Sequence, residues 1–265
     1  MKKNILLIGH GAMARKVLQE LPDHLQISHL LIREAQRAET EAALAGSGIH
    51  IVTSLEECEA VPDFALECAG HGAVEQYGAE FLAKGIDFGV VSVGALANKA
   101  LMDQLEAAAQ AGKSQLHILA GAVAGIDALA AAREGGLDEV IYSSCKPPLS
   151  WLNSPAEQLL DLKSLTEPTA FYEGNAREAA RQFPANANVA ATIALAGLGF
   201  EKTRVRLVAD PTVKGNVHRI HARGSFGEFD IELRGKPLVD NPKTSTLAAL
   251  SAVRALRHGG DWIVI

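Results

Sequence analysis

The 265-residue chain has few cysteines and no excess of basic residues. Its three cysteines, Cys58, Cys68 and Cys145, are far apart and form no C-x-x-C pair, which predicts a reduced, cytoplasmic protein without a structural metal. The formal net charge of −6 disfavours nucleic-acid binding, because neutralising phosphates requires clustered lysines and arginines. No apolar run reaches the ~18 residues of a membrane span. The apolar start NILLI is too short for a signal peptide and leads into a glycine turn.

Strand-like and helix-like segments alternate through the first part of the chain. Short apolar runs such as NILLI are typical of buried parallel strands, and segments with helical spacing separate them. The expected strands are 4–8, 27–32, 49–53, 64–68, 88–91 and 116–120, and the expected helices are 13–21, 39–45, 73–84 and 98–111. Repeated βα units predict a doubly wound parallel sheet, so we expect an α/β, Rossmann-type dinucleotide-binding domain over residues 1–120.

The pattern changes near residue 121, where a helix is expected over 125–133. Apolar and polar residues then alternate with period two at 139–145, 203–209, 216–223 and 228–234. A helix-rich stretch, which includes 187–197, separates the first two of these segments. Such alternation is typical of an antiparallel sheet with one solvated face. We therefore predict a second α/β domain with a largely antiparallel sheet over 121–241. The helical tail, 242–265, is expected to pack back on the first domain.

A glycine motif follows the first expected strand. The stretch Gly9-His10-Gly11-Ala12-Met13-Ala14 fits G-x-G-x-x-A between a strand and a helix. The first glycine permits a tight turn, the second lets a pyrophosphate approach the backbone, and the alanine lets helix and strand pack closely. A pyrophosphate would lie at the helix N-terminus, where N–H groups and the helix dipole favour anions. We expect Gly9, Gly11, Ala12 and Met13 to bind a dinucleotide; the alternative is a glycine turn without a ligand.

Two further stretches bear on the cofactor. Arg33 follows the second expected strand, where NAD enzymes usually carry an acidic residue and where an arginine accommodates the 2′-phosphate of NADP. It favours NADP or dual use, unless it is only a solvated strand-end residue. Cys68, Ala69 and His71 end another strand on the side expected for the nicotinamide ring, as does the small-residue stretch 92–96. His71 either lines the cofactor or is an ordinary histidine at a helix start.

Small residues and amides also open two helices of the second half. The turn Gly121-Ala122-Val123-Ala124-Gly125 either contributes to a ligand site or is a plain hinge. Asn186 fits a helix N-cap, whereas Asn188 falls in the first turn, where its amide could reach a cofactor or substrate. Cys145 would be the nucleophile of an acylating dehydrogenase, but it closes an alternating strand, and we interpret it as a structural thiol beside Lys146, which either binds an anion or is solvated.

Two histidines stand three residues apart in KGNVHRIHARG, at 214–224. In a strand, successive side chains point to opposite faces. His218 then shares its face with Ile220 and Ala222, whereas His221 lies with Arg219 and Arg223 on a face expected to meet solvent. His218 is thus the candidate for proton transfer, weighed against the commoner role of a buried histidine in a core.

Several of these stretches together resemble the L-aspartate dehydrogenase family over nearly the whole chain. They are GHGAMA at 9–14 with the preceding strand, ECAGH at 67–71, GAVAGIDALAAA at 121–132, FPANANVAATIALAG at 183–197, NVHRIHARG at 216–224 and NPKTSTLAALSAVRAL at 241–256. The resemblance implies a homodimer in which the second domain binds substrate, catalyses and dimerises. It also implies NAD- or NADP-dependent oxidation of L-aspartate to iminoaspartate, which feeds NAD biosynthesis or hydrolyses to oxaloacetate and ammonia.

The resemblance also assigns residues. The catalytic histidine of the family matches His218, and its cofactor-contacting positions match Ala124 and Asn188. The resemblance does not assign donors for the two carboxylates of aspartate; the candidates are Lys163, Thr166, Lys243, Thr244 and Ser245. The alternatives are a homoserine dehydrogenase-like or other amino-acid dehydrogenase, and a dinucleotide sensor without catalysis.

Overall fold

The computed structural model describes residues 4–239 and 241–257, with the side chains at 185, 242 and 243 left aside. The chain divides into two compact units. The first comprises the chain up to Leu119, Val239–Thr244 and the chain from Ala248. The second comprises Ala120–Leu238 with Ser245–Leu247. Among the described residues, no helix combines the length and apolar character that crossing a bilayer requires.

The first unit is built on a six-stranded parallel sheet in the order β3-β2-β1-β4-β5-β6. The strands are β1 (Ile5–Ile8), β2 (Ile27–Leu31), β3 (His50–Val52), β4 (Phe64–Glu67), β5 (Asp87–Val90) and β6 (Leu116–Ile118). This order is that of a doubly wound dinucleotide-binding fold, whose ligands bind beyond the carboxyl ends of the strands. The predicted fold class of the N-terminal part is confirmed.

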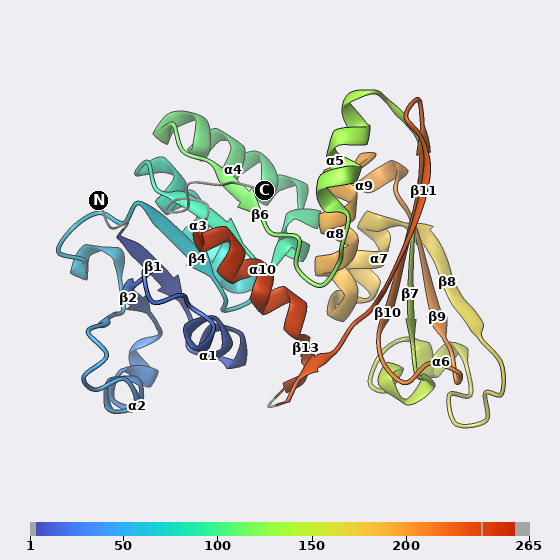
Figure 1. The fold of residues 1–265 in the computed structure, drawn as a ribbon, viewed down its shortest axis with the longest axis horizontal. Helices are drawn as coiled ribbons and strands as arrows, with labels where there is room; N and C mark the ends of the chain where they lie inside the picture. Colours follow the sequence, from blue (N-terminus) through green and yellow to red (C-terminus); the bar gives the residue numbers. More distant parts are fainter. Residues whose placement is uncertain (1–3, 240, 258–265) are drawn as a thin grey trace. The chain divides into compact units, whose positions relative to one another are not determined.

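Helices pack on this sheet and close its core. They are α1 (Ala12–Gln19), α2 (Arg37–Ala43), α3 (His71–Ala83), α4 (Lys99–Gly112) and α10 (Thr246–Arg257). Ala252, Val253 and Leu256 of α10 join Leu7 and Val17 in one buried cluster, and Figure 1 shows α10 in red near β1 and α1. The helix begins later than the tail predicted at 242–265, because strand β13 (Asn241–Ser245) precedes it and pairs with β12 (Pro237–Leu238). Residues 258–265 of that prediction lie outside the described part.

The second unit carries a five-stranded sheet in the order β11-β10-β7-β9-β8. Its strands are β7 (Leu137–Lys146), β8 (Thr169–Asn175), β9 (Arg204–Ala209), β10 (Val217–Gly224) and β11 (Gly227–Arg234). All neighbours are antiparallel except β7 and β9, which run parallel, so the predicted, largely antiparallel sheet is confirmed. Strand β8 corrects the sequence analysis, which assigned its segment to a helix-rich stretch. Its sequence TAFYEGN does not alternate clearly between apolar and polar residues. The segment forms a strand because it pairs with β9.

Helices cover one face of this second sheet. They are α5 (Ile126–Glu134), α7 (Ala176–Gln182), α8 (Ala187–Ala196) and α9 (Gly199–Lys202), while the short α6 (Ala156–Leu159) lies toward one end of the strands (Figure 1). On β10, Ile220 and Ala222 are buried with His218, whereas Arg219 and Arg223 are exposed. The alternation predicted for this strand is therefore present, although Val217 on the charged side is also buried.

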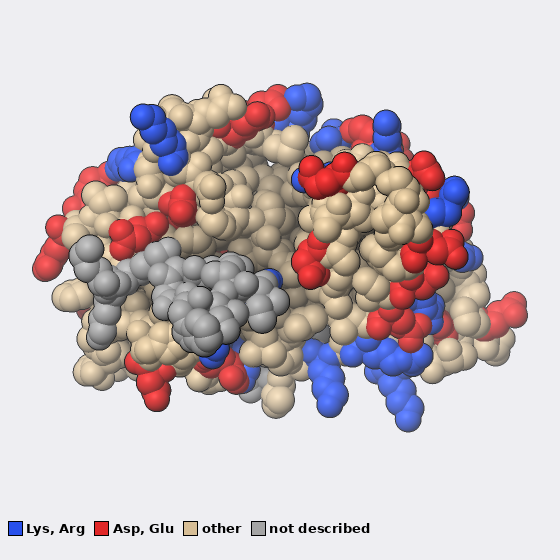
Figure 2. Space-filling view, turned by 45° about the horizontal axis from the view of Figure 1, so that its top comes forward, with Lys and Arg blue, Asp and Glu red and all other residues tan. Residues whose placement is uncertain are grey.

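The outer face of the same sheet carries charges of both signs. Arg219 pairs with Glu232 at 2.6 Å, Arg206 with Glu173 at 2.9 Å, and Arg204 with Glu139 at 3.4 Å. On the face of the molecule drawn in Figure 2, acidic and basic side chains are likewise interspersed. That face offers no continuous basic surface to a phosphate backbone.

Candidate active site

The turn after β1 requires a glycine at its first position. Gly9 has φ +91°, a conformation that L side chains rarely adopt, and a Cβ there would lie 2.8 Å from the Cβ of Ala69. Its backbone N–H donates to the carbonyl of Leu31 at 2.8 Å, which fixes the turn against β2. Gly11 differs, because a Cβ there would meet nothing within 4 Å. The space beside Gly11 is therefore open to a ligand.

Helix α1 begins at this turn with free backbone donors. Gly11 is its N-cap residue, no side chain caps the first turn, and no acidic residue lies in that turn. The first N–H groups of a helix have no partner within the helix and carry a partial positive charge. Ala14 is fully buried, which allows the helix to pack closely on the sheet. The start of α1 therefore fits the pyrophosphate of a dinucleotide.

A hollow of about 450 Å³ lies at this end of the parallel sheet. Of the cofactor residues predicted from the sequence, Gly9, Gly11, Arg33, Cys68 and Ala69 line it. The lining also includes side chains that the sequence analysis did not select, namely His10, Gln36, Gln76 and Tyr77. Ala12 and Met13 belong to the first turn of α1, and His71 is the first residue of α3. These three are not among the lining residues.

Arg33 lies just beyond β2 and is exposed. Its Nε donates to Oε1 of Gln36 at 3.3 Å, and both side chains line the hollow. The neighbouring Glu34 is turned to Arg37, whose Nε lies 3.3 Å from its Oε2. No carboxylate is among the residues that line the hollow. A guanidinium and an amide thus stand where NAD-specific enzymes hold an acidic residue.

Glu67, at the end of β4, organises two loops at this edge of the sheet. The residue is fully buried. Its Oε1 accepts bonds from the N–H groups of Ala69 and Gly70 at 2.7 and 2.6 Å and from the Ser92 hydroxyl at 2.9 Å. Its Oε2 accepts from the Ser92 N–H at 2.9 Å. One carboxylate therefore ties the loop after β4 to the loop after β5, the two stretches predicted to lie beside the nicotinamide.

In the second unit, His218 forms a buried pair with Tyr142. The tyrosine hydroxyl lies 2.8 Å from His218 Nδ1, and the two rings stack with centroids 6.0 Å apart. His218 is 6% exposed. Burial lowers the pKa of His218 to about 4, and the positive charge of Lys146 contributes in the same direction. The imidazole is therefore neutral at pH 7, and because Nδ1 is engaged, Nε2 is the nitrogen left to exchange a proton.

Lys146 is the last residue of β7 and lies on the His218 side of the sheet, since it shares alternation with Tyr142 and Ser144. Burial lowers its pKa to about 8. Its Nζ lies 4.6 Å from the ring centroid of Trp151, in a cation–π contact. From the sequence, Lys146 was expected either to bind an anion or to be solvated, and Tyr142 was not selected. The period-two pattern of β7 shows that Tyr142, Ser144 and Lys146 lie on one face. It does not show the pairing of β7 with β10, which sets Ser144 opposite His218.

The remaining predicted residues fall into three groups. Ala124 lies just before α5 and Asn188 in the first turn of α8, and both are exposed in the second unit. Lys163 and Thr166 are exposed in the segment between α6 and β8, away from any regular element. In β13, Ser245 has a buried hydroxyl with no hydrogen-bond partner among the described residues, and Thr244 is half-buried. The side chain of Lys243 lies outside the described part.

Cys145 lies on the outer face of the second sheet, opposite the face that carries His218. It is 1% exposed and packs with Val208 and Val217. Burial raises its pKa, so that the thiol stays protonated near neutral pH. Arg219 approaches the sulfur at 3.2 Å. These surroundings agree with the structural interpretation of this cysteine.

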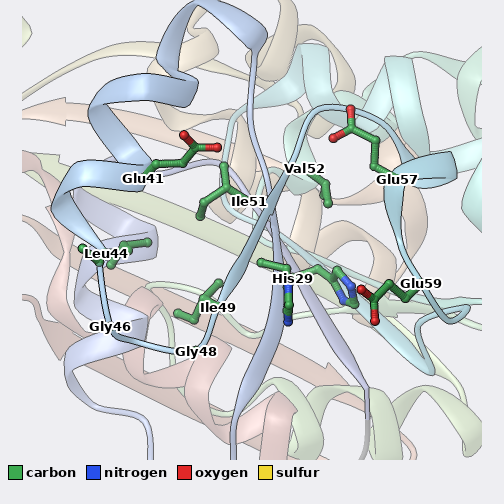
Figure 3. Close-up of a pocket in the computed structure, with 12 residues that line it drawn as sticks. His29, Glu41, Leu44, Gly46, Gly48, Ile49, Ile51, Val52, Glu57 and Glu59 are labelled. Carbon is green, nitrogen blue, oxygen red and sulfur yellow. The ribbon is translucent and has the colours of Figure 1, made fainter.

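A second hollow, of about 410 Å³, lies at the β3 edge of the first sheet and is drawn in Figure 3. It carries His29 with three carboxylates, those of Glu41, Glu57 and Glu59. Arg37 pairs with Glu57 at 2.5 Å and with Glu41 at 3.7 Å. Across the described ranges, no group of three or more His, Cys, Asp or Glu side chains is arranged to hold a metal ion. We therefore assign no site to this hollow.

Comparisons with known proteins agree with this arrangement. The family profile "Aspartate dehydrogenase, C-terminal" matches residues 127–259, and "Homoserine dehydrogenase, NAD binding domain" matches residues 9–119. An L-aspartate dehydrogenase of Serratia proteamaculans is 53% identical over 256 residues, 97% of each chain. One of Acinetobacter baumannii is 49% identical over 265 residues, covering 99% of this chain and 100% of the relative. The crystal structure of the Thermotoga maritima aspartate dehydrogenase shares the fold, with a TM-score of 0.77, 23% identity and full coverage of both chains.

Proposed function

Because the chain belongs to the aspartate dehydrogenase family, we propose that it oxidises L-aspartate to iminoaspartate with NAD or NADP. The relatives that carry this name are similar over nearly its whole length. The observation that carries the proposal is that the chain contains both a dinucleotide-type glycine turn, in the first unit, and a buried, neutral histidine, in the second. Such a reaction needs a hydride acceptor and a proton acceptor, and the chain has a place suited to each.

The first unit is the proposed holder of the dinucleotide. Gly9 permits the tight turn and Gly11 leaves room for the pyrophosphate, which the N–H groups at the start of α1 would bind. When bound, the nicotinamide supplies the hydride acceptor. Cys68 and Ala69 would contact the cofactor from the loop that Glu67 orders. Ala12, Met13 and His71 remain proposed contacts at helix starts, as do Ala124 and Asn188 in the second unit.

Arg33 is the residue on which the choice between NAD and NADP is proposed to depend. Its guanidinium and the Gln36 amide would bind a 2′-phosphate, and no carboxylate lines the hollow to repel one. We expect dual use with a preference for NADP. Fluorescence titration with NADPH and NADH should show that Arg33→Ala weakens NADPH binding about 10-fold or more and leaves NADH binding nearly unchanged. Equal losses for the two cofactors would refute this role.

His218 is the proposed catalytic residue. A neutral imidazole can accept the proton that the substrate amine must lose before hydride leaves Cα, and can later activate water at the imine carbon. Tyr142 would hold the ring in the tautomer that this role needs: Nδ1–H donates to the tyrosine hydroxyl oxygen, which leaves the Nε2 lone pair to accept the proton. The carboxylate donors are proposed among Lys163, Thr166, Lys243, Thr244 and Ser245. His218→Ala should lower turnover ~10²–10⁴-fold and change dinucleotide affinity little.

The product and the assembly complete the proposal. Iminoaspartate would feed NAD biosynthesis or hydrolyse to oxaloacetate and ammonia. We also propose a cytoplasmic homodimer, as family resemblance implies, with the second unit forming the dimer contact. Sedimentation at micromolar protein would distinguish a dimer of the 28.0 kDa chain from a monomer.

A substrate panel tests the proposed reaction. Reduction of NAD and NADP is followed at 340 nm with L-aspartate, D-aspartate, L-glutamate and L-homoserine. The expected result is turnover of L-aspartate far above the others. Preference for L-homoserine would favour the alternative suggested by the match of residues 9–119 to a homoserine dehydrogenase domain. Dinucleotide binding without turnover of any amino acid would indicate a sensor.

A further inference from the structure

We propose that Lys146 binds a carboxylate of the amino-acid substrate, an inference that rests on the proposed function. The residue was not among the donors expected from the sequence. Its position is set by β7, where Lys146, Ser144 and Tyr142 lie on one face. On the neighbouring strand, His218 stands opposite Ser144 in the register. The lysine therefore shares a face of the sheet with the proposed catalytic histidine.

The Lys146 side chain is half-buried, and its ammonium group has no counter-ion among the described residues. It makes no ion pair with a carboxylate among the described residues, and desolvation is the cause of its lowered pKa. Asp210 donates its backbone N–H to the Lys146 carbonyl at 2.9 Å, and its Oδ1 accepts bonds from the Thr212 N–H at 2.8 Å and the Thr212 hydroxyl at 2.6 Å. Burying an unpaired charge is costly, so a structural role alone would not favour a lysine here.

The ammonium group is also held in place. Trp151 lies under it at 4.6 Å and is 2% exposed. The indole Nε1 donates to the Val208 carbonyl at 3.1 Å, and the Phe171 ring packs against the indole edge at 4.7 Å. A cation whose position is fixed loses little freedom when an anion arrives, which favours binding.

The groups around Lys146 define the ligand that fits. His218 faces it from β10, and the Tyr142 and Ser144 hydroxyls lie on β7 itself. The His218 ring and the two hydroxyls can each donate a hydrogen bond, and none of the three carries a negative charge near pH 7. A cation with neutral donors and no carboxylate suits an anion. For an acidic amino acid, this anion is one of its two carboxylates.

Substitution of Lys146 separates binding from chemistry. With L-aspartate, Lys146→Met should raise KM roughly 10- to 100-fold with kcat changed only a few-fold, because a charge-assisted bond present in both ground and transition states is lost. Lys146→Arg should retain much of the affinity. Lys202→Met, on an exposed position of α9, serves as the matched control and should behave as wild type. The dinucleotide affinity should be the same in all four proteins.

Succinate, an unreactive dicarboxylate, supplies a readout besides turnover. Calorimetry should detect succinate binding to the wild type and to Lys202→Met but not to Lys146→Met. The wild-type affinity should fall as pH rises through about 8, where Lys146 loses its proton, while His218 and Tyr142 keep their neutral forms. In Lys146→Arg this fall should be absent, because arginine keeps its charge.

The outcomes are distinguishable. If Lys146→Met binds succinate as tightly as the wild type, or lowers kcat with KM unchanged, the carboxylate role is overturned. If the wild type binds succinate through Lys146 but does not oxidise L-aspartate, the proposed function fails and the anion site stands. The melting temperature of Lys146→Met should not fall below that of the wild type, because a half-buried charge with no counter-ion among the described residues is removed. A large fall would indicate a structural lysine and would also overturn the proposal.

Discussion

At the residue scale, the buried His218 and the half-buried Lys146 lie on one face of the second sheet, and desolvation lowers the pKa of both. The pKa of His218 is about 4 and that of Lys146 about 8. At a given pH, both side chains are charged less often than the same side chains free in water. Keeping such groups in the fold lowers its stability, and proteins commonly do so at functional sites. The pair is better suited to handling a proton and an anion than to supporting the fold.

The histidine predicts a specific dependence of stability on pH. The folded-state pKa of His218, about 4, lies below its usual value of 6.5, so the unfolded chain binds the proton more readily. Stability from the neutral ring is fully present above about pH 6.5 and is lost as the pH falls toward 4. Compared with a His218→Gln variant, the wild type should lose at most about 3 kcal/mol of unfolding free energy between pH 7 and pH 4.

Urea denaturation of both proteins at several pH values measures this difference. Carboxylates titrate in the same range in both proteins, so their contribution cancels in the comparison. A difference that stays constant from pH 7 to pH 4 would show that His218 is not held neutral by the fold.

At the element scale, the two glycines of the turn between β1 and α1 have different roles: Gly9 is expected to matter for stability and Gly11 for dinucleotide binding. Gly9→Ala places a Cβ 2.8 Å from the Cβ of Ala69 at φ +91°, and should lower the unfolding free energy by about 1–3 kcal/mol. Gly11→Ala meets no atom within 4 Å, so stability should change by less than about 1 kcal/mol. Its methyl group would instead occupy the space beside the first N–H groups of α1.

Thermal unfolding and NADPH titration of the two variants test this distinction. Gly11→Ala should weaken NADPH binding at least about 10-fold while the melting temperature stays near that of the wild type. If Gly11→Ala binds NADPH normally, the pyrophosphate does not approach the chain at this turn.

The loops at the end of β4 and β5 depend on one carboxylate. Glu67→Gln replaces an oxygen by an NH2 group that faces N–H and hydroxyl donors, and so loses acceptor capacity in a buried place. The unfolding free energy should fall by at least about 2 kcal/mol, and dinucleotide binding should weaken because Ala69 shifts. Glu75→Gln, on an exposed position of α3, is the control. Equal stability of the two variants would contradict this account.

Strand β8 shows where sequence reasoning stops at this scale. Buried parallel strands such as β1 carry continuous apolar runs, and β10 and β11 alternate with period two, so both kinds were predictable. β8 has intermediate burial along most of its length and is followed directly by α7. Its strand character comes from pairing with β9, which local sequence does not encode.

At the scale of the whole molecule, periodicity predicted the class of both sheets, and family resemblance singled out His218. Strand alternation placed His218 on the buried face without help. The sequence did not place Tyr142 and Lys146 beside His218, because that proximity depends on the register between β7 and β10 and on packing around Trp151. Contacts between distant segments are set by packing, and single-sequence patterns do not specify them.

The central claim is that hydride leaves Cα of L-aspartate for a nicotinamide cofactor bound by this chain. The most direct test is a single reaction with L-aspartate deuterated at Cα and with NAD or NADP, followed by mass spectrometry of the reduced cofactor. The account predicts a reduced dinucleotide that carries one deuterium. Formation of reduced cofactor without deuterium, or no reduction by a folded protein that binds the dinucleotide, would contradict it.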